Sequence, residues 1–182
     1  MFDKFYTKKF INIEFAVFFP KKAFLCRIPF IKILFALLYP KYGVIYFHRQ
    51  NRRLFKQNNP FNRFYFLINH YFNSIEINPN ASLGQNVKIP HPFAVVIGGN
   101  TVIGDNCVVM SGVTFGVNSA MHKKKIYPKL GKSCYVATGA KIIGEIEIGS
   151  KSIIGANSFV NKNFEVNSTI VGVPGKLLRK NE

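Results

Sequence analysis

The sequence predicts a mainly β protein, built as a parallel β-helix with a short α-helical region at its N-terminal end. The main evidence is a row of aliphatic residues at every sixth position from Leu130 to Val166. The same period returns between Ile77 and Phe115. An α-helix repeats every ~3.6 residues and an isolated strand every two, so neither explains this pattern. A period of six is typical of a parallel β-helix, in which aliphatic side chains stack from one coil to the next.

Residues 1–73 form the first predicted domain, a basic and phenylalanine-rich helical region. Residues 1–72 hold 13 of the 25 Lys and Arg residues and 15 of the 19 phenylalanines, but only two acids. Residues 44–57 have helical spacing, with Arg49, Arg52, Arg53 and Lys56 expected on the solvent side. A second helix should begin at Asn59-Pro60, because proline is favoured in the first helical turn. One face of this helix would carry the residues Phe61, Phe64, Tyr65, Ile68 and Phe72.

Two compatible interpretations remain open for this region. It is either a cap that covers the open end of the β-helix and helps subunits meet, or a basic and aromatic surface that lies on an anionic membrane. The most apolar piece, residues 28–39, is shorter than the ~20 residues that a membrane-spanning helix needs. Any membrane contact is therefore expected to be peripheral, at the inner face.

The second predicted domain is the β-helix itself, residues 74–172, followed by a C-terminal tail of residues 173–182. Its upstream aliphatic residues form two runs that are out of register by two residues, and the period fails again between Phe115 and Leu130. These breaks predict an irregular bend around His91 and a loop over residues 117–129. Loops that leave a solenoid often carry function. The three runs are Ile77, Leu83, Ile89 and Val95; Ile97, Ile103, Val109 and Phe115; and Leu130, Val136, Ile142, Ile148, Ile154, Val160 and Val166.

Composition limits the partners and the compartment. The formal net charge of +17 suggests a polyanionic partner such as nucleic acid, anionic lipid, an acidic polysaccharide or a phosphorylated cofactor. No nucleic-acid-binding motif accompanies the charge, so we expect no nucleic acid partner. Cys26, Cys107 and Cys134 are odd in number and unclustered, which predicts neither a metal site nor a disulfide framework. With no signal-peptide pattern in residues 1–10, a reducing cytoplasm is expected.

His91 is the candidate catalytic residue. It lies between Pro90 and Pro92 at the first register break, and both prolines fix the backbone of the bend. Glu76 precedes it by fifteen residues, so a coil of about eighteen residues would place the two groups in neighbouring layers ~4.8 Å apart. A carboxylate on one ring nitrogen makes the other nitrogen a better base. The alternative is an exposed turn histidine without a role.

Residues 74–178 resemble the catalytic domain of the serine acetyltransferases and the related bacterial polysaccharide O-acetyltransferases, which are hexapeptide-repeat acyltransferases. The order and spacing of seven segments carry the resemblance. They are Ile77-Asn78-Pro79-Asn80-Ala81, Ile89-Pro90-His91-Pro92, Val95-Val96-Ile97-Gly98, Gly112-Val113-Thr114-Phe115-Gly116, Tyr127-Pro128-Lys129, Thr138-Gly139-Ala140-Lys141 and Val171-Gly172-Val173-Pro174-Gly175-Lys176.

The resemblance implies a left-handed β-helix that assembles as a homotrimer and binds acetyl-CoA between neighbouring helices, without a metal. It implies that His91 is the general base for the acceptor hydroxyl, and that Glu76 replaces the aspartate that usually supports this base. Direct attack on the thioester needs no acyl-enzyme, so Cys107 and Cys134 are expected to be packing residues. The contacts to pantetheine carried over by position are Gly116, Thr138 (usually alanine) and Ala156. Lys176, after Gly172-Val173-Pro174, is expected to meet the CoA phosphates, unless it is a solvated C-terminal lysine.

The departures from the family pattern favour a sugar acceptor. In serine acetyltransferases, an aspartate directly before the catalytic histidine and an Arg-His pair after the loop hold serine, whereas this chain has Pro90, Ile126 and Tyr127. We therefore expect an O-acetyltransferase that acts on a sugar hydroxyl of a cell-surface polysaccharide or its precursor. Tyr127 would bind the glycan. The lysines of the loop, Lys123, Lys124 and Lys125, would bind an acidic glycan or the 3′-phosphate of CoA, unless they are a solvated loop tip. The alternatives are a serine O-acetyltransferase of cysteine biosynthesis and a non-catalytic assembly module.

Overall fold

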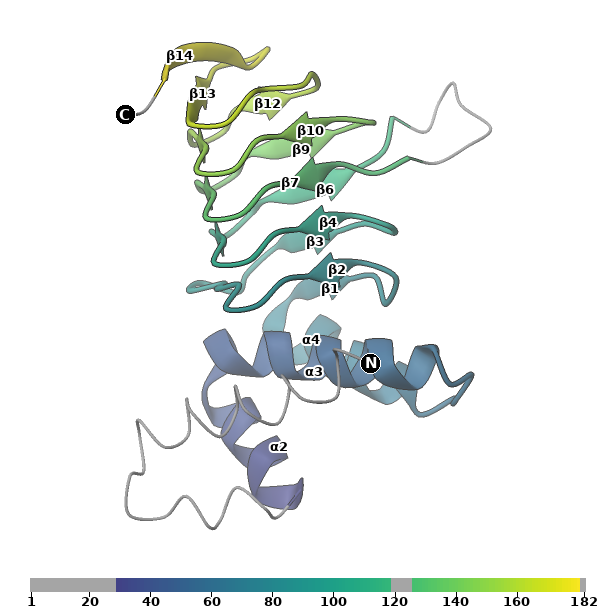
Figure 1. Cartoon of the computed structure of the whole chain (residues 1–182). Coiled ribbons are helices and arrows are strands. Elements are labelled where there is room, and N and C mark those ends of the chain that lie inside the picture. Colours follow the sequence, from purple (N-terminus) through teal and green to yellow (C-terminus); the bar gives the residue numbers. More distant parts are fainter. Residues whose placement is uncertain (1–28, 119–125, 181–182) are drawn as a thin grey trace.

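The computed structural model describes residues 29–118 and 126–180, and Figure 1 shows a helical base below a stack of β coils. The base holds α2 (Pro29–Leu38), α3 (Pro40–Phe55) and α4 (Asn62–Asn73). Helix α3 begins at a proline, a residue that suits the first helical turn because its missing N–H would have no partner there. None of the helices in the described part of the chain is both long and apolar enough to cross a bilayer.

The buried side of α4 differs from the apolar face seen in the sequence. Phe61, Phe64 and Phe72 are exposed, and Phe72 retains 75% of its accessible surface. Polar contacts explain this orientation, because the buried Asn69 donates a hydrogen bond to the Val44 carbonyl of α3 (3.1 Å). Helix α4 therefore packs on α3 partly through an amide and leaves a row of aromatic side chains in solvent.

The β-helix has three faces, which we call sheets A, B and C. Their strand orders are β1-β3-β6-β9-β12, β10-β7-β4-β2 and β14-β13-β11-β8-β5. All strand pairs are parallel except the last, in which β14 turns back along β13. The strands are β1 (Ile75–Ile77), β2 (Ser82–Leu83), β3 (Val95–Ile97), β4 (Val102–Ile103), β5 (Val108–Val109), β6 (Thr114–Gly116), β7 (Lys129–Leu130), β8 (Tyr135–Val136), β9 (Lys141–Ile143), β10 (Glu147–Ile148), β11 (Ile153–Ile154), β12 (Phe159–Val160), β13 (Ser168–Val171) and β14 (Lys176–Lys180).

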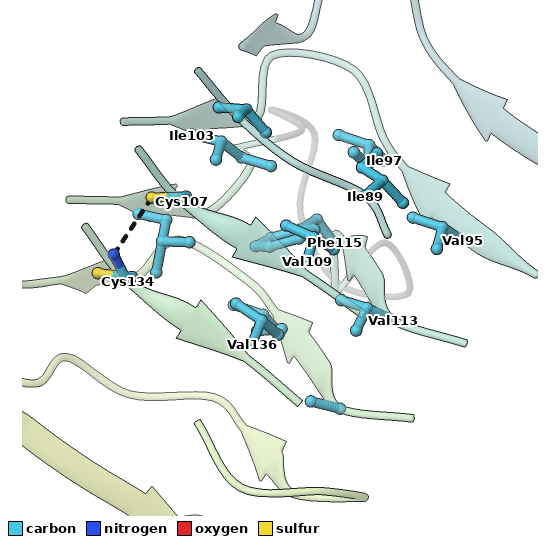
Figure 2. Packing of buried hydrophobic residues seen from close by; sticks show 14 of the residues in the cluster. Ile89, Val95, Ile97, Ile103, Cys107, Val109, Val113, Phe115, Cys134 and Val136 are labelled. Carbon is cyan, nitrogen blue, oxygen red and sulfur yellow. Dashed lines mark hydrogen bonds between the residues drawn. The ribbon is translucent and has the colours of Figure 1, made fainter. Parts of the chain in front are cut away.

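The core is a set of aliphatic rows along the helix axis, as the period of six predicts (Figure 2). In sheet A, the pairing register stacks Ile77, Ile97, Phe115, Ile142 and Val160, all of which are buried. Both register breaks are absorbed between strands. Ile97 follows Ile77 by 20 residues (97 − 77) and Ile142 follows Phe115 by 27 (142 − 115), against 18 for a regular coil (115 − 97).

The predicted row is wrong at its last member. Val166 is 55% exposed, and Phe164 takes the position above Ile148 in sheet B. The last coil is shorter there, because Phe164 follows Ile148 by only 16 residues (164 − 148). Cys107 and Cys134, predicted to be packing residues, are free and buried in neighbouring coils, where the Cys134 N–H donates to the Cys107 sulfur (3.4 Å).

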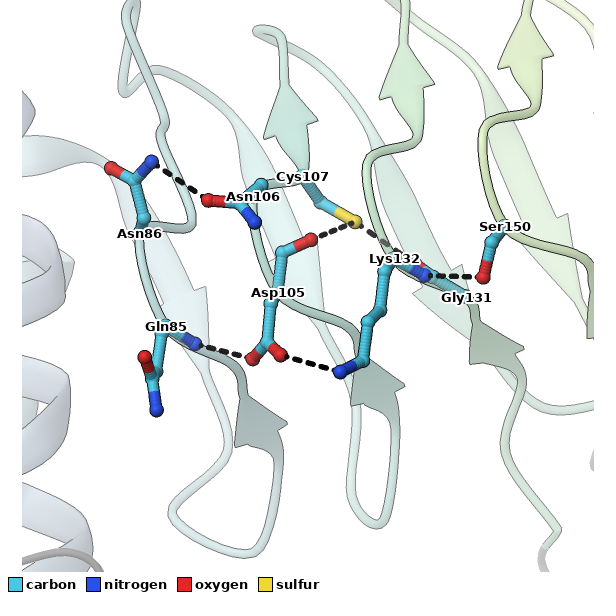
Figure 3. Close-up of polar contacts among 8 residues, drawn as sticks. All are labelled: Gln85, Asn86, Asp105, Asn106, Cys107, Gly131, Lys132 and Ser150. Atoms are coloured by element: carbon cyan, nitrogen blue, oxygen red, sulfur yellow. Dashed lines mark hydrogen bonds and ion pairs between the residues drawn. The ribbon is translucent and has the colours of Figure 1, made fainter.

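Two corners of the β-helix border sheet A. The first corner leads from sheet C into sheet A, and we call it the histidine corner. It contains residues 91–94, 111–112, 138–139 and 156–157. The second corner leads from sheet A to sheet B, and we call it the glycine corner. It contains residues 98–99, 116 and 143–144. Figure 3 shows the third corner, where Asn86 donates to Asn106 (2.9 Å) and Asp105 pairs with Lys132 (3.0 Å). Residues with positive φ occupy the same place in successive coils of the histidine corner, namely Ser74, Ala94, Gly112, Gly139 and Asn157.

Helix α3 closes the lower end of the β-helix. Val44 and Ile45 belong to the same buried cluster as the coil residues. Arg49 donates to the Gly84 carbonyl (3.1 Å), and Arg52 donates to the carbonyls of Asn80 (3.0 Å) and Ala81. The expectation that these two arginines lie on a solvent face is therefore wrong, because unpaired carbonyls of the first coil attract them. The contacts fit a cap over the open end.

Candidate active site at the histidine corner

The bend that carries His91 is fastened to the neighbouring coil. The Phe93 N–H donates to the His91 carbonyl (2.9 Å), and the Ala94 N–H donates to the Ser74 carbonyl (2.9 Å) just before β1. The His91 side chain is exposed at this corner. The prolines on both sides lack N–H groups, which explains why the chain bends here instead of continuing a ladder.

Glu76 is the central residue of β1 and faces outward from sheet A, opposite Val96 of β3. Within the described single chain, no hydrogen bond joins its carboxylate to the His91 imidazole. Both side chains are nevertheless exposed on adjacent coils, on either side of the Ala94–Ser74 contact. The proposed pair of base and carboxylate therefore stays a prediction.

Two of the predicted CoA contacts lie in one column with the His91 bend. Gly112 donates to the Phe93 carbonyl, Gly139 to the Ser111 carbonyl and Asn157 to the Thr138 carbonyl, each at 2.9 Å. These bonds place exposed Thr138 and Ala156 on successive coils of the histidine corner.

Gly139 is required in this column for two reasons. Its φ is +76°, a value that L residues rarely adopt, and a Cβ atom there would lie 2.0 Å from Oδ1 of Asn157.

Lys176 stands near the upper end of the same region. It is the first residue of β14, and the preceding Gly175 donates to the Phe159 carbonyl at the start of sheet A's last strand (2.7 Å). Its side chain is exposed. A flexible ammonium in this position can meet a phosphate as a point charge.

Gly116 and Tyr127 lie at the glycine corner, at the opposite edge of sheet A from His91. Gly116 ends β6, and its carbonyl accepts a hydrogen bond from Gly144 (3.0 Å). The Tyr127 ring rests on the turn after β3. A Cβ atom on Gly98 would lie 2.5 Å from its Cε1 atom, and one on Gly99 would lie 2.5 Å from its Cζ atom. This contact between Tyr127 and the turn was not predicted, although the Gly98-Gly99 doublet in the sequence indicated a place where another group approaches the backbone closely.

The remaining residues of interest are the lysines of the loop, the possible metal ligands and Lys141. Lys123, Lys124 and Lys125 lie outside the described residues. Among the residues that are described, no three His, Cys, Asp or Glu side chains could jointly hold a metal ion. Lys141 of β9 was not among the predicted site residues; its ammonium donates to the Gly112 carbonyl (2.7 Å) and to the Thr114 hydroxyl (3.0 Å).

Comparisons with known proteins agree with this geometry. No protein-family model matches the chain. A serine acetyltransferase of Bacillus subtilis is 37% identical over 151 residues, which cover 80% of this chain and 67% of that protein. The solved Brucella abortus serine acetyltransferase in complex with coenzyme A is 29% identical, with a TM-score of 0.75, and the match covers 79% of this chain and 58% of that one.

The soybean serine acetyltransferase complexed with serine is 28% identical, with a TM-score of 0.71, over 75% of this chain and 56% of that one. This chain spans between about half and two thirds of the length of the curated relatives that it matches. The fold prediction, a left-handed parallel β-helix with a short helical N-terminal region, is confirmed by these neighbours.

The predicted acceptor is wrong. The relatives that match most of the chain are serine acetyltransferases, which favours the alternative, a serine O-acetyltransferase, over an enzyme of polysaccharide or capsule synthesis. The error came from three positions, Pro90, Ile126 and Tyr127, that lack the charges of a serine site. Their neutrality does not exclude charges that other residues bring to the histidine corner, and Lys141 is such a residue.

Proposed function

Because the chain belongs to the serine acetyltransferase family, we propose that it transfers an acetyl group from acetyl-CoA to the hydroxyl of serine. Membership of this family also confirms the predicted class of acetyl-CoA-dependent acyltransferases. The observation that carries the proposal is the column at the histidine corner. It aligns His91 with Thr138 and Ala156, the positions expected to contact CoA. Relatives with this fold have been solved with coenzyme A and with serine.

In the proposed reaction, a neutral His91 ring nitrogen takes the proton of the serine hydroxyl while the oxygen attacks the thioester carbonyl carbon. The carbon–sulfur bond then breaks, and the CoA thiolate takes the proton from the imidazolium. The products are O-acetylserine and CoA, and no bond to the protein forms. The Glu76 carboxylate would orient the ring and stabilise its charged form.

We also propose that the site is completed by a second copy of the chain in a homotrimer. His91 precedes β3 and the glycine corner follows it, so at least the length of this three-residue strand, about 10 Å, lies between the two corners. A neighbouring subunit that presents its glycine corner to the histidine corner would bring Gly116 and Tyr127 to the base. The implied mass, three times 20.7 kDa, can be measured by analytical ultracentrifugation.

A peripheral contact of the cap with an anionic membrane is a further proposal about partners. Residues 29–73 contain seven Lys or Arg residues and no Asp or Glu. The same segment exposes Phe61, just before α4, and Phe64, Leu67, Tyr71 and Phe72 on α4. Basic residues beside exposed aromatic rings suit the interface of an anionic bilayer.

The main experiment measures thiol release from acetyl-CoA by the purified full-length chain. Serine, threonine, ethanolamine and water are offered as acceptors, and the acetylated product is identified by mass spectrometry. Serine-dependent release that requires His91 supports the proposal. If CoA binds but serine does not accelerate thiol release, the acceptor is wrong. If CoA does not bind at all, the hypothesis that the chain is a non-catalytic assembly module is favoured instead.

A further inference from the structure

Lys141 occupies an unusual place for an exposed lysine. It is the first residue of β9 and faces outward from sheet A. Its side chain reaches back by one coil, where the ammonium donates to the Gly112 carbonyl (2.7 Å) and to the Thr114 hydroxyl (3.0 Å). Two short bonds fix the charge at one point, whereas a lysine side chain in solvent is usually flexible.

That point is beside the His91 bend. Gly112 donates its N–H to the Phe93 carbonyl, and Phe93 donates its N–H to the His91 carbonyl, both at 2.9 Å. The coil that holds the Lys141 ammonium is therefore the one directly next to the bend. Adjacent coils are ~4.8 Å apart, so the Lys141 ammonium, held on the Gly112 coil, lies about one coil spacing from the backbone of the His91 bend.

The ammonium also has capacity left for a ligand. A lysine ammonium carries three N–H donors, and Gly112 and Thr114 account for two of them. The ion pairs between described residues involve Lys129, Lys132 and Lys180, and none involves Lys141. A fixed cation with a free donor and no carboxylate partner within the described chain is suited to bind an anionic group of a substrate.

We propose that Lys141 is the residue that holds the carboxylate of the acceptor amino acid and so determines specificity. The inference rests on the proposed function. Serine presents a carboxylate, and this chain has Ile126 and Tyr127 where the family's pattern places an arginine and a histidine. With its carboxylate on Lys141, serine can turn its hydroxyl towards His91 on the adjacent coil. Lys141 is thus a binding residue and takes no part in proton transfer.

The competing explanation is that Lys141 only ties two coils together through Gly112 and Thr114. The two explanations differ when the acceptor loses its carboxylate. Serinamide keeps the hydroxyl and the amino group of serine but replaces the carboxylate with a neutral amide. A residue that ties coils together affects both acceptors equally, whereas a residue that binds carboxylate affects serine alone.

The experiment compares wild type, Lys141→Gln, Lys141→Arg and the control Lys129→Gln. Lys129 is also an outward lysine of a strand, but it lies on sheet B and pairs with Glu147 (2.6 Å). KM and kcat are measured for serine and serinamide at saturating acetyl-CoA. A lost hydrogen bond to a charged group should raise the serine KM of Lys141→Gln about ten- to a hundredfold, with the serinamide KM and the melting temperature unchanged. Lys141→Arg should recover part of the serine affinity, and the control should behave as wild type.

Calorimetric titration of the CoA-bound protein with serine and with serinamide separates this inference from the proposed function. If serine is not acetylated but binds with an affinity that requires Lys141, the proposed reaction fails and the carboxylate site stands. If Lys141→Gln weakens serine and serinamide alike, or changes neither, the inference is wrong. A fall in melting temperature with equal losses on both acceptors would assign Lys141 to the connection between coils.

Discussion

His48 should make this protein sensitive to mild acid. The side chain lies in α3 under the first coil and is 1% exposed. Neither ring nitrogen makes a hydrogen bond of normal geometry among the described residues, although the Ala81 backbone lies close enough to oppose part of the pKa shift. Burial, followed by the positive charge of Arg52, lowers the pKa of His48 from 6.5 to about 3. The folded protein therefore holds a neutral imidazole at any pH above about 3.

The sign of the effect follows from proton binding. Below pH 6.5 the unfolded chain takes up a proton on this histidine and the folded chain does not, so the free energy of unfolding falls as pH decreases. The loss is about 1.4 kcal/mol per pH unit, or about 2 kcal/mol at pH 5 relative to pH 7. The fall should continue until the folded protein is also protonated near pH 3.

Urea unfolding followed by circular dichroism from pH 7 to pH 4.5, at fixed protein concentration, measures this slope. His48→Phe fills a similar volume without a titrating group, and it should remove most of the pH dependence between pH 6.5 and 5. His70→Phe is the matched control, because His70 is exposed on α4, and it should keep the wild-type slope. Equal slopes for wild type and His48→Phe would refute a buried neutral His48.

Three further predictions concern the site and the cap. His91→Ala should lower kcat by about 10²–10⁴-fold with CoA affinity retained, and Glu76→Gln should lower kcat less. Both values can be measured from the rate of CoA thiol release. Gly99→Ala should cost about 1–3 kcal/mol because its Cβ would lie 2.5 Å from the Tyr127 ring, and the additional change Tyr127→Ala should recover most of this loss in thermal unfolding. The full chain should sediment with vesicles containing anionic lipid but not with neutral ones. Salt at 0.5 M should release it, because the Debye length there is about 4 Å, compared with about 10 Å at 0.1 M. Binding to both kinds of vesicle at high salt would contradict the electrostatic attachment.

The coils were predictable because their signal is local and repeated. Each aliphatic row continues across both insertions, since the extra residues leave between strands and do not enter the stack. Val166 was mispredicted because the last coil drops two residues, a change that a fixed period cannot register. Arg49 was mispredicted for another reason: it binds a backbone carbonyl, and a carbonyl has no sequence signature.

The site was only partly predictable. His91 and Glu76 had a spacing that could be interpreted, and the resemblance supplied Thr138 and Ala156. Lys141 donates hydrogen bonds to the preceding coil, and the Tyr127 ring packs on two glycines. Both contacts join segments that are 27–29 residues apart in the sequence, so they depend on the three-dimensional structure. The acceptor was mispredicted because it was inferred from three neutral positions, Pro90, Ile126 and Tyr127, whereas the similarity over most of the chain is to serine acetyltransferases.

The reversed strand at the top of the stack has a consequence for how copies of the chain can meet end to end. A coil of a parallel β-helix offers its open edge to any chain that arrives in the same direction, so an uncovered end invites fibre growth. Here α3 occupies one end, and at the other end antiparallel β14 ends the parallel ladder of sheet C (Figure 1). All five residues of β14 are exposed and three of them, Lys176, Arg179 and Lys180, are basic. Copies that approach end to end along sheet C therefore meet like charges and a strand of the opposite direction, which disfavours growth of this sheet from one copy to the next.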